Sequence, residues 1–302
     1  MKPTNYLSAI LIILVAFSCQ VGFSASPKME TKDLGGVWSV CPQPLDCIGP
    51  EGFETVQKTI EGWIPSQVPG EIHLDLMNAG QMEEPCFGDN MPNCRWPETK
   101  SWWYKTTIQV DEDFISFERQ RIVFDGLDYY AQIFLNGELL GESANAFLPA
   151  EFDVKWKLKP GGNELMVRLT VGSELVTDDS KPGQWNAPHK PDYKDIPQPA
   201  SKERYYDQRH WYGNKQLRKP QFSYGWDWVD TLPNIGIWRG VRLEGRSYAV
   251  LDDIRLDTII KEGKVSLEME SIVENLHPWS ERGCVLRLQI TPPDGEKPLA
   301  KE

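Results

Sequence analysis

Short runs of alternating apolar and polar residues restrict the fold of this chain more than any other feature. Residues 165–171, 265–270 and 286–290 each carry an apolar side chain at every second position. Successive side chains of a strand point to opposite faces of a sheet, so period two over short runs predicts antiparallel strands with one buried face. Asn136-Gly137 between two apolar runs predicts a hairpin. Only residues 70–76 have the pattern of a helical turn, and the sequence therefore predicts an all-β fold.

The strand pattern divides the chain into two parts. Residues 238–244 predict the last strand of a first domain, in which Trp238 is expected to be a packing residue, and Ile254-Arg255-Leu256 predicts a strand that opens a second domain. We place the boundary at residue 248, which gives a β domain over 26–248 and a second strand-rich segment over 249–302.

One segment has the composition of a carbohydrate site. Asp227 lies between Trp226 and Trp228, and the cations Arg218 and Lys219 precede them. A carboxylate accepts hydrogen bonds from sugar hydroxyls, an indole face packs against the C–H face of a pyranose, and nearby cations would keep Asp227 ionised. The residues alone leave a second interpretation open, in which the indoles form a buried cluster and Asp227 caps a turn.

The same segment resembles the N-terminal sugar-binding domain of the β-mannosidases of glycoside hydrolase family 2. Further matches follow in the same order along residues 35–246: Val68-Pro69-Gly70, Trp102-Trp103-Tyr104, residues 124–128 with 131–137, residues 145–149 with 152–154, and residues 236–239. Each match alone is weak, and the ordered set carries the resemblance.

The resemblance implies a jelly-roll β-sandwich for residues 26–248, followed by the start of an immunoglobulin-like sandwich. Residues 249–302 are about half of the ~100 residues that such a sandwich contains. It also implies a retaining hydrolase of terminal β-D-mannosyl residues, in which Trp226, Asp227 and Trp228 form one wall of the sugar pocket. The family's two catalytic glutamates lie on a later barrel domain, so we expect no catalytic residue and no glycosidase activity within these 302 residues.

Charge and histidine content exclude two classes of function. The chain has 44 acidic and 32 basic residues, a formal charge of −12, whereas a nucleic-acid surface needs clustered Lys and Arg. The four histidines are scattered and lack metal-ligand spacing. We therefore expect β-mannoside glycans as partners, no nucleic acid, and no metal or organic cofactor.

The N-terminus has the pattern of an export signal. Lys2 precedes an apolar run over residues 7–17, and small residues at 24 and 25 fit a cleavage site. The run is shorter than the ~20 apolar residues that span a bilayer. We expect residues 1–25 to be removed and the protein to be periplasmic or extracellular. A lipid anchor at Cys19 is the alternative, although Phe17 fits a lipobox poorly.

Five cysteines remain after such a cleavage. In an oxidising compartment the local pairs Cys41–Cys47 and Cys86–Cys94 are the natural disulfides, and Cys284 is expected to be a buried thiol. Five reduced thiols are the alternative.

Two other functions stay open at this point. One is a β-sandwich that binds carbohydrate without hydrolysing it. The other is a different specificity in the same family, such as β-galactosidase, β-glucuronidase or exo-glucosaminidase.

Overall fold

The computed structural model describes residues 28–172, 175, 217–224, 231–262 and 264–276, and the backbone of three strands at 12–18, 285–291 and 300–301. The chain forms two compact units. The larger contains Thr31–Ser116 and Gln120–Glu244, and the smaller contains Met1–Glu30, Phe117–Arg119 and Gly245–Glu302.

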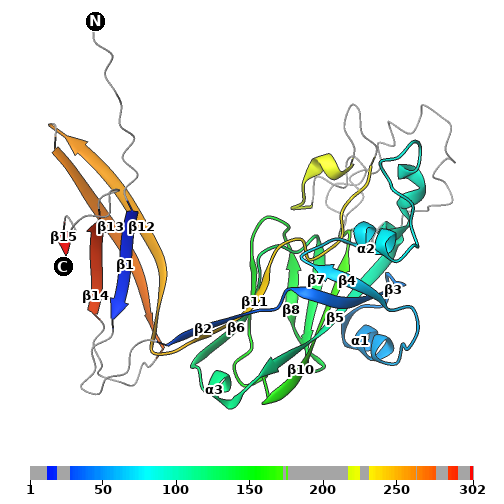
Figure 1. Ribbon diagram of the computed structural model, residues 1–302, viewed down its shortest axis with the longest axis horizontal. Helices are drawn as coiled ribbons and strands as arrows, with labels where there is room; N and C mark the ends of the chain where they lie inside the picture. The colour runs from blue at the N-terminus through cyan, green and yellow to red at the C-terminus, as the bar shows by residue number, and fades with distance from the viewer. Residues whose placement is uncertain are drawn as a thin grey trace, which may run out of the picture. The chain divides into compact units, whose positions relative to one another are not determined.

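The larger unit is an antiparallel β-sandwich (Figure 1). The six-stranded sheet contains, in spatial order, β4 (Ile64–Val68), β3 (Gly36–Pro44), β5 (Lys100–Val110), β10 (Gly161–Thr170), β7 (Tyr130–Leu135) and β8 (Glu138–Ala144). The four-stranded sheet contains β2 (Met29–Asp33), β11 (Val241–Arg246), β6 (Arg119–Phe124) and β9 (Ala150–Asp153). The predicted all-β sandwich is confirmed.

Local signals located the hairpin and one helix. Asn136 and Gly137 connect β7 to β8 with φ angles of 50° and 90°, the positive values that a tight type I′ turn requires at both positions. The predicted helical turn is α2 (Ile72–Asn78), in which the amides of His73 and Leu74 donate to the carboxylate of Glu71. The sequence did not predict α1 (Gly49–Gln57), α3 (Glu112–Ile115) or the 3₁₀ turns η1 (Met91–Cys94), η2 (Trp96–Thr99) and η7 (Gln221–Tyr224).

Strand β10 differs from its prediction, because both of its faces are buried. Met166 and Arg168, the predicted solvent-facing residues, are 1% and 0% exposed. Helix α1 covers this outer face: Phe53 of α1 stacks on Phe134 of β7 with ring centroids 5.1 Å apart, and Trp103 of β5 lies 5.5 Å from the same ring. These side chains belong to a core cluster that also contains Met166.

The predicted strand at 238–244 begins later, at Val241. Trp238 therefore lies before the strand, and 40% of it is exposed. The Arg239 guanidinium lies 4.2 Å from the centroid of its indole. The expectation that Trp238 is a packing residue of an alternating strand is wrong.

The smaller unit is also built from strands. Strands β12 (Ala249–Lys261) and β13 (Lys264–Asn275) pair antiparallel, and β1 (Ile12–Ser18), β14 (Val285–Thr291) and β15 (Ala300–Lys301) form a three-stranded sheet. The apolar run of the predicted export signal thus overlaps β1, which pairs with β14 from Ile12↔Thr291 to Ser18↔Val285. The immunoglobulin-like assignment and the cleavage of residues 1–25 stay predictions. No helix among the described residues is long and apolar enough to cross a membrane.

The predicted disulfides are not formed. Cys41, Cys47, Cys86 and Cys94 are free thiols, whereas Cys19 and Cys284 lie outside the residues whose side chains are described. The Cys47 thiol donates to the Gly52 carbonyl at 3.5 Å, within the α1 cluster, and the Cys94 thiol donates to the Glu83 carbonyl at 3.6 Å. Local spacing suggested these pairs, but the buried sulfurs of Cys47 and Cys94 each have a separate backbone acceptor.

Candidate functional site

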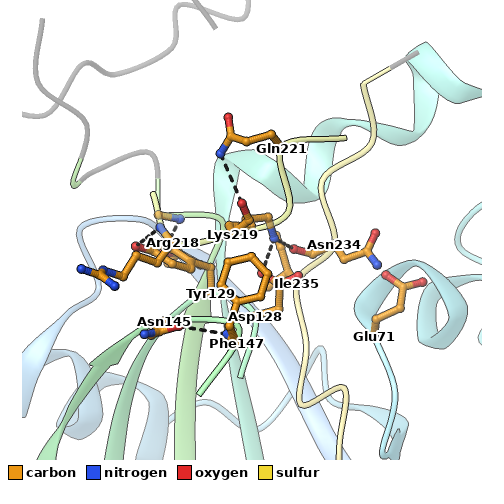
Figure 2. A network of polar contacts seen from close by, with 12 residues as sticks. Glu71, Asp128, Tyr129, Asn145, Phe147, Arg218, Lys219, Gln221, Asn234 and Ile235 are labelled. Atoms are coloured by element: carbon orange, nitrogen blue, oxygen red, sulfur yellow. Dashed lines mark hydrogen bonds and ion pairs between the residues drawn. The ribbon is translucent and has the colours of Figure 1, made fainter. Parts of the chain in front are cut away.

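The predicted sugar-contact residues Trp226, Asp227 and Trp228 lie outside the described residues. Both flanks of this segment are described, as residues 217–224 before it and 231–240 after it. Figure 2 shows the polar network that holds the flanks, with Arg218, Lys219 and Gln221 on one side and Asn234 and Ile235 on the other.

A buried ion pair lies at the centre of this network. The ammonium of Lys219 bonds to the carboxylate of Asp128, and the two side chains are 0% and 9% exposed. The same ammonium donates to the backbone carbonyl of Asn234. The sequence suggested Lys219 as a cation for Asp227, but its partners among the described residues are Asp128 and Asn234.

Burial acts on the titration of both members of the pair. Burial lowers the pKa of Lys219, and the Asp128 carboxylate opposes that shift. Burial raises the pKa of Asp128, and the Lys219 ammonium opposes that shift. The two groups thus support each other's charged forms in a place from which water is excluded.

The C-terminal flank pairs with two other parts of the sandwich. Asp128 and Gly236 exchange both backbone hydrogen bonds, at 2.9 and 2.7 Å. The amides of Gly70 and Ile72, at the start of α2, donate to the carbonyls of Ile237 and Ile235, each at 2.9 Å. A Cβ on Gly236 would lie 2.4 Å from the Gly70 carbonyl oxygen, so this close approach requires glycine.

The N-terminal flank is hydrogen-bonded to Tyr129 and Ala146 of the sandwich. The Arg218 amide donates to the Tyr129 hydroxyl at 3.1 Å, and the Ala146 amide donates to the Arg218 carbonyl at 2.9 Å. The neighbouring turn is held by Asn145, whose side-chain oxygen accepts from the Phe147 amide at 2.9 Å, as Figure 2 shows. Phe147 is 56% exposed, so this turn presents an aromatic ring to solvent beside the flank.

The two flanks also meet each other. The Leu232 amide donates to the Ser223 carbonyl at 3.1 Å, and the Thr231 hydroxyl donates to the Tyr224 carbonyl at 2.8 Å. Hydrogen bonds between described residues therefore join residues 223–224 directly to residues 231–232.

Ionisable side chains also lie in and next to α2. The imidazole Nδ1 of His73 lies 2.7 Å from the Glu71 carboxylate, and Asp75 accepts from the Gln67 amide at 3.0 Å. Burial raises the pKa of Asp75. Burial also raises the pKa of Tyr104, and the carboxylates of Asp75 and Glu71 add to that shift. No group of three potential metal ligands gathers among the residues that the structure describes.

Sequence reasoning missed the central ion pair. Asp128 and Lys219 are 91 positions apart, and neither stands in a pattern that predicts a buried partner. Asp128 lay inside a segment used for the resemblance, but nothing local distinguished its buried carboxylate from a surface carboxylate.

Comparison with known proteins places this arrangement in a family. Residues 53–239 match the glycosyl hydrolase 2 galactose-binding domain-like family. Beta-mannosidase B of Thermothelomyces thermophilus is 31% identical over 231 residues, which are 74% of this chain and 24% of that protein. Beta-mannosidase of Rattus norvegicus is 29% identical over 192 residues, which are 63% of this chain and 20% of that protein.

A solved structure shares the fold. The beta-D-mannosidase of Dictyoglomus thermophilum superposes with a TM-score of 0.60 at 23% identity, over 90% of this chain and 36% of that one. The chain spans about a quarter of the length of the fungal relative. Because the family match covers more than half of its residues, the chain belongs to the glycosyl hydrolase 2 galactose-binding domain-like family.

Proposed function

We propose that this chain is the sugar-binding β-sandwich of a β-mannosidase that releases terminal β-D-mannosyl residues with retention of configuration. The observation that carries the proposal is the anchoring of the segment that contains Trp226, Asp227 and Trp228. The buried ammonium of Lys219 on one flank donates to the Asn234 carbonyl on the other flank. The Leu232 amide also donates to the Ser223 carbonyl, so a second hydrogen bond joins the two flanks. A sugar wall needs such fixed ends, because a preorganised site loses less entropy when it binds.

The three residues have separate roles in this proposal. The Asp227 carboxylate accepts hydrogen bonds from sugar hydroxyls, and the indoles of Trp226 and Trp228 pack against the pyranose ring. Relatives named beta-mannosidase, at 31% and 29% identity, support mannose as the sugar. The ring of Phe147 is exposed, and the amide of its neighbour Ala146 donates to the Arg218 carbonyl, so an aromatic surface lies beside the N-terminal flank.

The catalytic carboxylates belong, in this proposal, to a part of the enzyme outside these 302 residues. A retaining glycosidase needs two carboxyl groups about 5 Å apart across the scissile bond. Supporting this view, the chain corresponds to 24% of the fungal beta-mannosidase. The chain by itself is then expected to bind a mannoside weakly and not to hydrolyse it.

A binding panel tests the proposal. The purified chain is titrated calorimetrically with methyl β-D-mannoside, and with the matching β-galactoside, β-glucuronide and β-N-acetylglucosaminide as controls for the other family specificities. The proposal predicts saturable binding that is tightest for the mannoside. Binding that favours another glycoside would assign the chain to that specificity, and no saturable binding to any of them would remove the sugar-binding function.

Catalysis separates the enzyme from the non-catalytic module. An open reading frame that continues past codon 302 into a barrel, with a product that hydrolyses an aryl β-mannoside, supports the enzyme. A stop codon after Glu302 supports the module.

The proposal includes export. The apolar run after Lys2 supports a periplasmic or extracellular location, with residues 1–25 removed. N-terminal sequencing of the mature protein tests it: a start near Ala25 or Ser26 agrees with export, a diacylated Cys19 replaces it by a lipid anchor, and an intact Met1 contradicts both.

A further inference from the structure

We infer that the indole of Trp156 is a carbohydrate-contact surface, a flat platform for one ring of a β-1,4-linked hexopyranose chain. Trp156 lies on the turn at residues 154–158, between β9 and β10, and 87% of it is exposed. All residues of this turn are described, and none belongs to the segment for which a sugar wall is proposed above.

Trp156 has a backbone conformation that a bulky residue rarely adopts. Its φ is 71°, in the left-handed region that favours Gly and Asn. A side chain that is 87% exposed contributes little packing energy to offset this strain, so stability does not explain a tryptophan here. Strained residues that the surrounding structure holds in place cluster at functional sites, which motivates a binding role for the indole.

Packing and hydrogen bonds hold the turn around Trp156. Val154 and Leu158, two positions before and after it, are 0% and 7% exposed. The Lys157 amide donates to the Val154 carbonyl at 3.0 Å, and the Asn136 side-chain amide donates to the Lys157 carbonyl at 3.1 Å. The backbone is thus fixed on both sides of the exposed indole.

The ring of Trp156 is supported on one face. The Lys155 ammonium lies 4.5 Å from the ring centroid and donates to the Ile115 carbonyl at 3.2 Å. A cation over one face is attracted by the π system and helps to orient the ring. With 87% of the residue exposed, the opposite face is open to solvent, and a preoriented surface loses less entropy when it binds.

A single isolated indole favours a sugar over a protein or a membrane as its ligand. Within residues 151–160, Trp156 is the one exposed large apolar side chain, because Phe152, Val154 and Leu158 are buried. Protein and membrane contacts use contiguous apolar patches of roughly 300 Å² or more. One indole face instead matches the C–H face of one pyranose.

Polar groups for sugar hydroxyls belong to the same region. Asp153 is exposed, and the Lys157 ammonium forms a partly exposed ion pair with Glu138. Carboxylates accept and ammonium groups donate the hydrogen bonds that hydroxyls form. A β-1,4-linked chain is extended and presents ring faces along its length, so it can place one ring on the indole.

The platform and the anchored flanks lie at opposite ends of β7. Asn136, which holds the turn, follows the last residue of β7, whereas Asp128 and Tyr129, which hold the flanks, precede the first. A strand rises about 3.3 Å per residue, so the length of β7 separates the two places by roughly 20 Å. Figure 1 shows the same separation between α2, beside the flanks, and α3, which ends at Ile115.

Two local NMR signals test the platform: the indole N–H of Trp156 and the backbone amide of Lys157. The labelled chain is titrated separately with β-1,4-mannohexaose and with cellohexaose. We expect both signals to shift saturably with each sugar, because stacking on a ring face depends little on the configuration of one hydroxyl, and a shift with either sugar supports the inference. The signals report on this turn alone, so the result is independent of whether methyl β-D-mannoside binds and of the proposed function.

Two substitutions at the same position provide matched variants. Trp156→Asn suits the positive φ and removes an exposed ring, so the melting temperature should be unchanged or higher. The hexaose concentration that half-saturates the Lys157 shift should rise roughly tenfold in this variant. Trp156→Tyr keeps an aromatic face with the same backbone strain, and we expect it to retain most of the affinity.

Three results would overturn the inference. One is the absence of a saturable shift at Trp156 with either hexaose. Another is a Trp156→Asn variant with a much lower melting temperature and an unchanged Lys157 titration, which would assign the indole to stability. The third is a Trp156 signal that responds to vesicles of phosphatidylcholine and phosphatidylglycerol and to neither hexaose, which would assign the surface to a membrane.

Discussion

The guanidinium of Arg168 donates from Nε to the backbone carbonyl of Cys47 at 2.8 Å, on the covered outer face of the six-stranded sheet and with none of the side chain exposed. A second nitrogen of the same group donates to the Leu45 carbonyl at 2.7 Å. A residue near the end of β10 thereby holds the loop that leads into α1, the helix that covers the outer face of the six-stranded sheet.

Loss of the Arg168 guanidinium should therefore destabilise the larger unit strongly. Arg168→Met leaves two carbonyls without these donors, and each unsatisfied buried polar group costs about 1–3 kcal/mol. We expect the free energy of unfolding in urea to fall by roughly 2–6 kcal/mol. The matched control is Arg121→Met, because Arg121 forms an ion pair with Glu151 at the surface, where such pairs contribute about 1 kcal/mol or less. Equal losses in the two variants would contradict the role given to Arg168.

Truncation of two tryptophans should cost very different amounts of stability. Trp103 is 0% exposed and packs against Phe134, so Trp103→Ala should cost about 3–5 kcal/mol. Trp238 is 40% exposed and lies outside a strand, so Trp238→Ala should cost much less. Chemical denaturation of both variants measures the difference. A loss at Trp238 as large as that at Trp103 would restore the packing role that its sequence position suggested.

Asp75 should make stability depend on pH. Burial raises the pKa of this carboxyl above its unfolded value of about 3.9, so the folded state binds the proton more tightly. The protonated Asp75 carboxyl therefore contributes to stability. This contribution is complete below the pKa of the unfolded state and is lost as pH rises through the raised pKa of the folded state. Asp75→Asn cannot ionise and keeps an oxygen to accept from the Gln67 amide. The stability of the variant relative to wild type should thus increase as pH rises from about 4 towards neutrality. Urea unfolding of both proteins at several pH values measures this difference. A difference in the free energy of unfolding that stays constant with pH would show that Asp75 does not contribute to the pH dependence.

The cysteines should differ in reactivity. Cys86 is exposed, whereas Cys41, Cys47 and Cys94 are buried, and burial raises the pKa of each of these three thiols. Because the thiolate is the reactive form, iodoacetamide should modify Cys86 first in the native protein and all four in urea. Peptide mapping by mass spectrometry measures the order. A peptide pair linked through Cys41 and Cys47, or through Cys86 and Cys94, would restore the predicted disulfides.

Local sequence signals predicted the parts of the fold that depend on neighbouring residues. Asn136-Gly137 located the β7–β8 hairpin because both residues favour the positive φ angles of that turn. Alternation could not show that β10 is buried on both faces, because the helix that covers it comes from residues 49–57, far away in the sequence. Trp238 illustrates the opposite error, in which an apolar residue before a strand was assigned to its buried face.

In the candidate site too, local composition was predictable from the sequence and long-range contacts were not. The composition of residues 226–228 indicated sugar chemistry, and the ordered segments around them indicated a family that the comparisons confirm. The buried pair of Asp128 and Lys219 had no local signal, because an ion pair between residues 91 positions apart is created only when the sandwich assembles.

The affinity of methyl β-D-mannoside for the wild-type chain and for Asp227→Ala tests the central claim most directly. If Asp227 accepts hydrogen bonds from the sugar, each charge-assisted bond is worth about 1.5–3 kcal/mol, so affinity should fall roughly ten- to hundredfold for each bond lost. The melting temperature should change little, because a carboxylate that faces a pocket does not hold the core. Unchanged affinity would remove Asp227 from the sugar site, and a large fall in melting temperature with unchanged affinity in the folded fraction would assign the segment to the core instead.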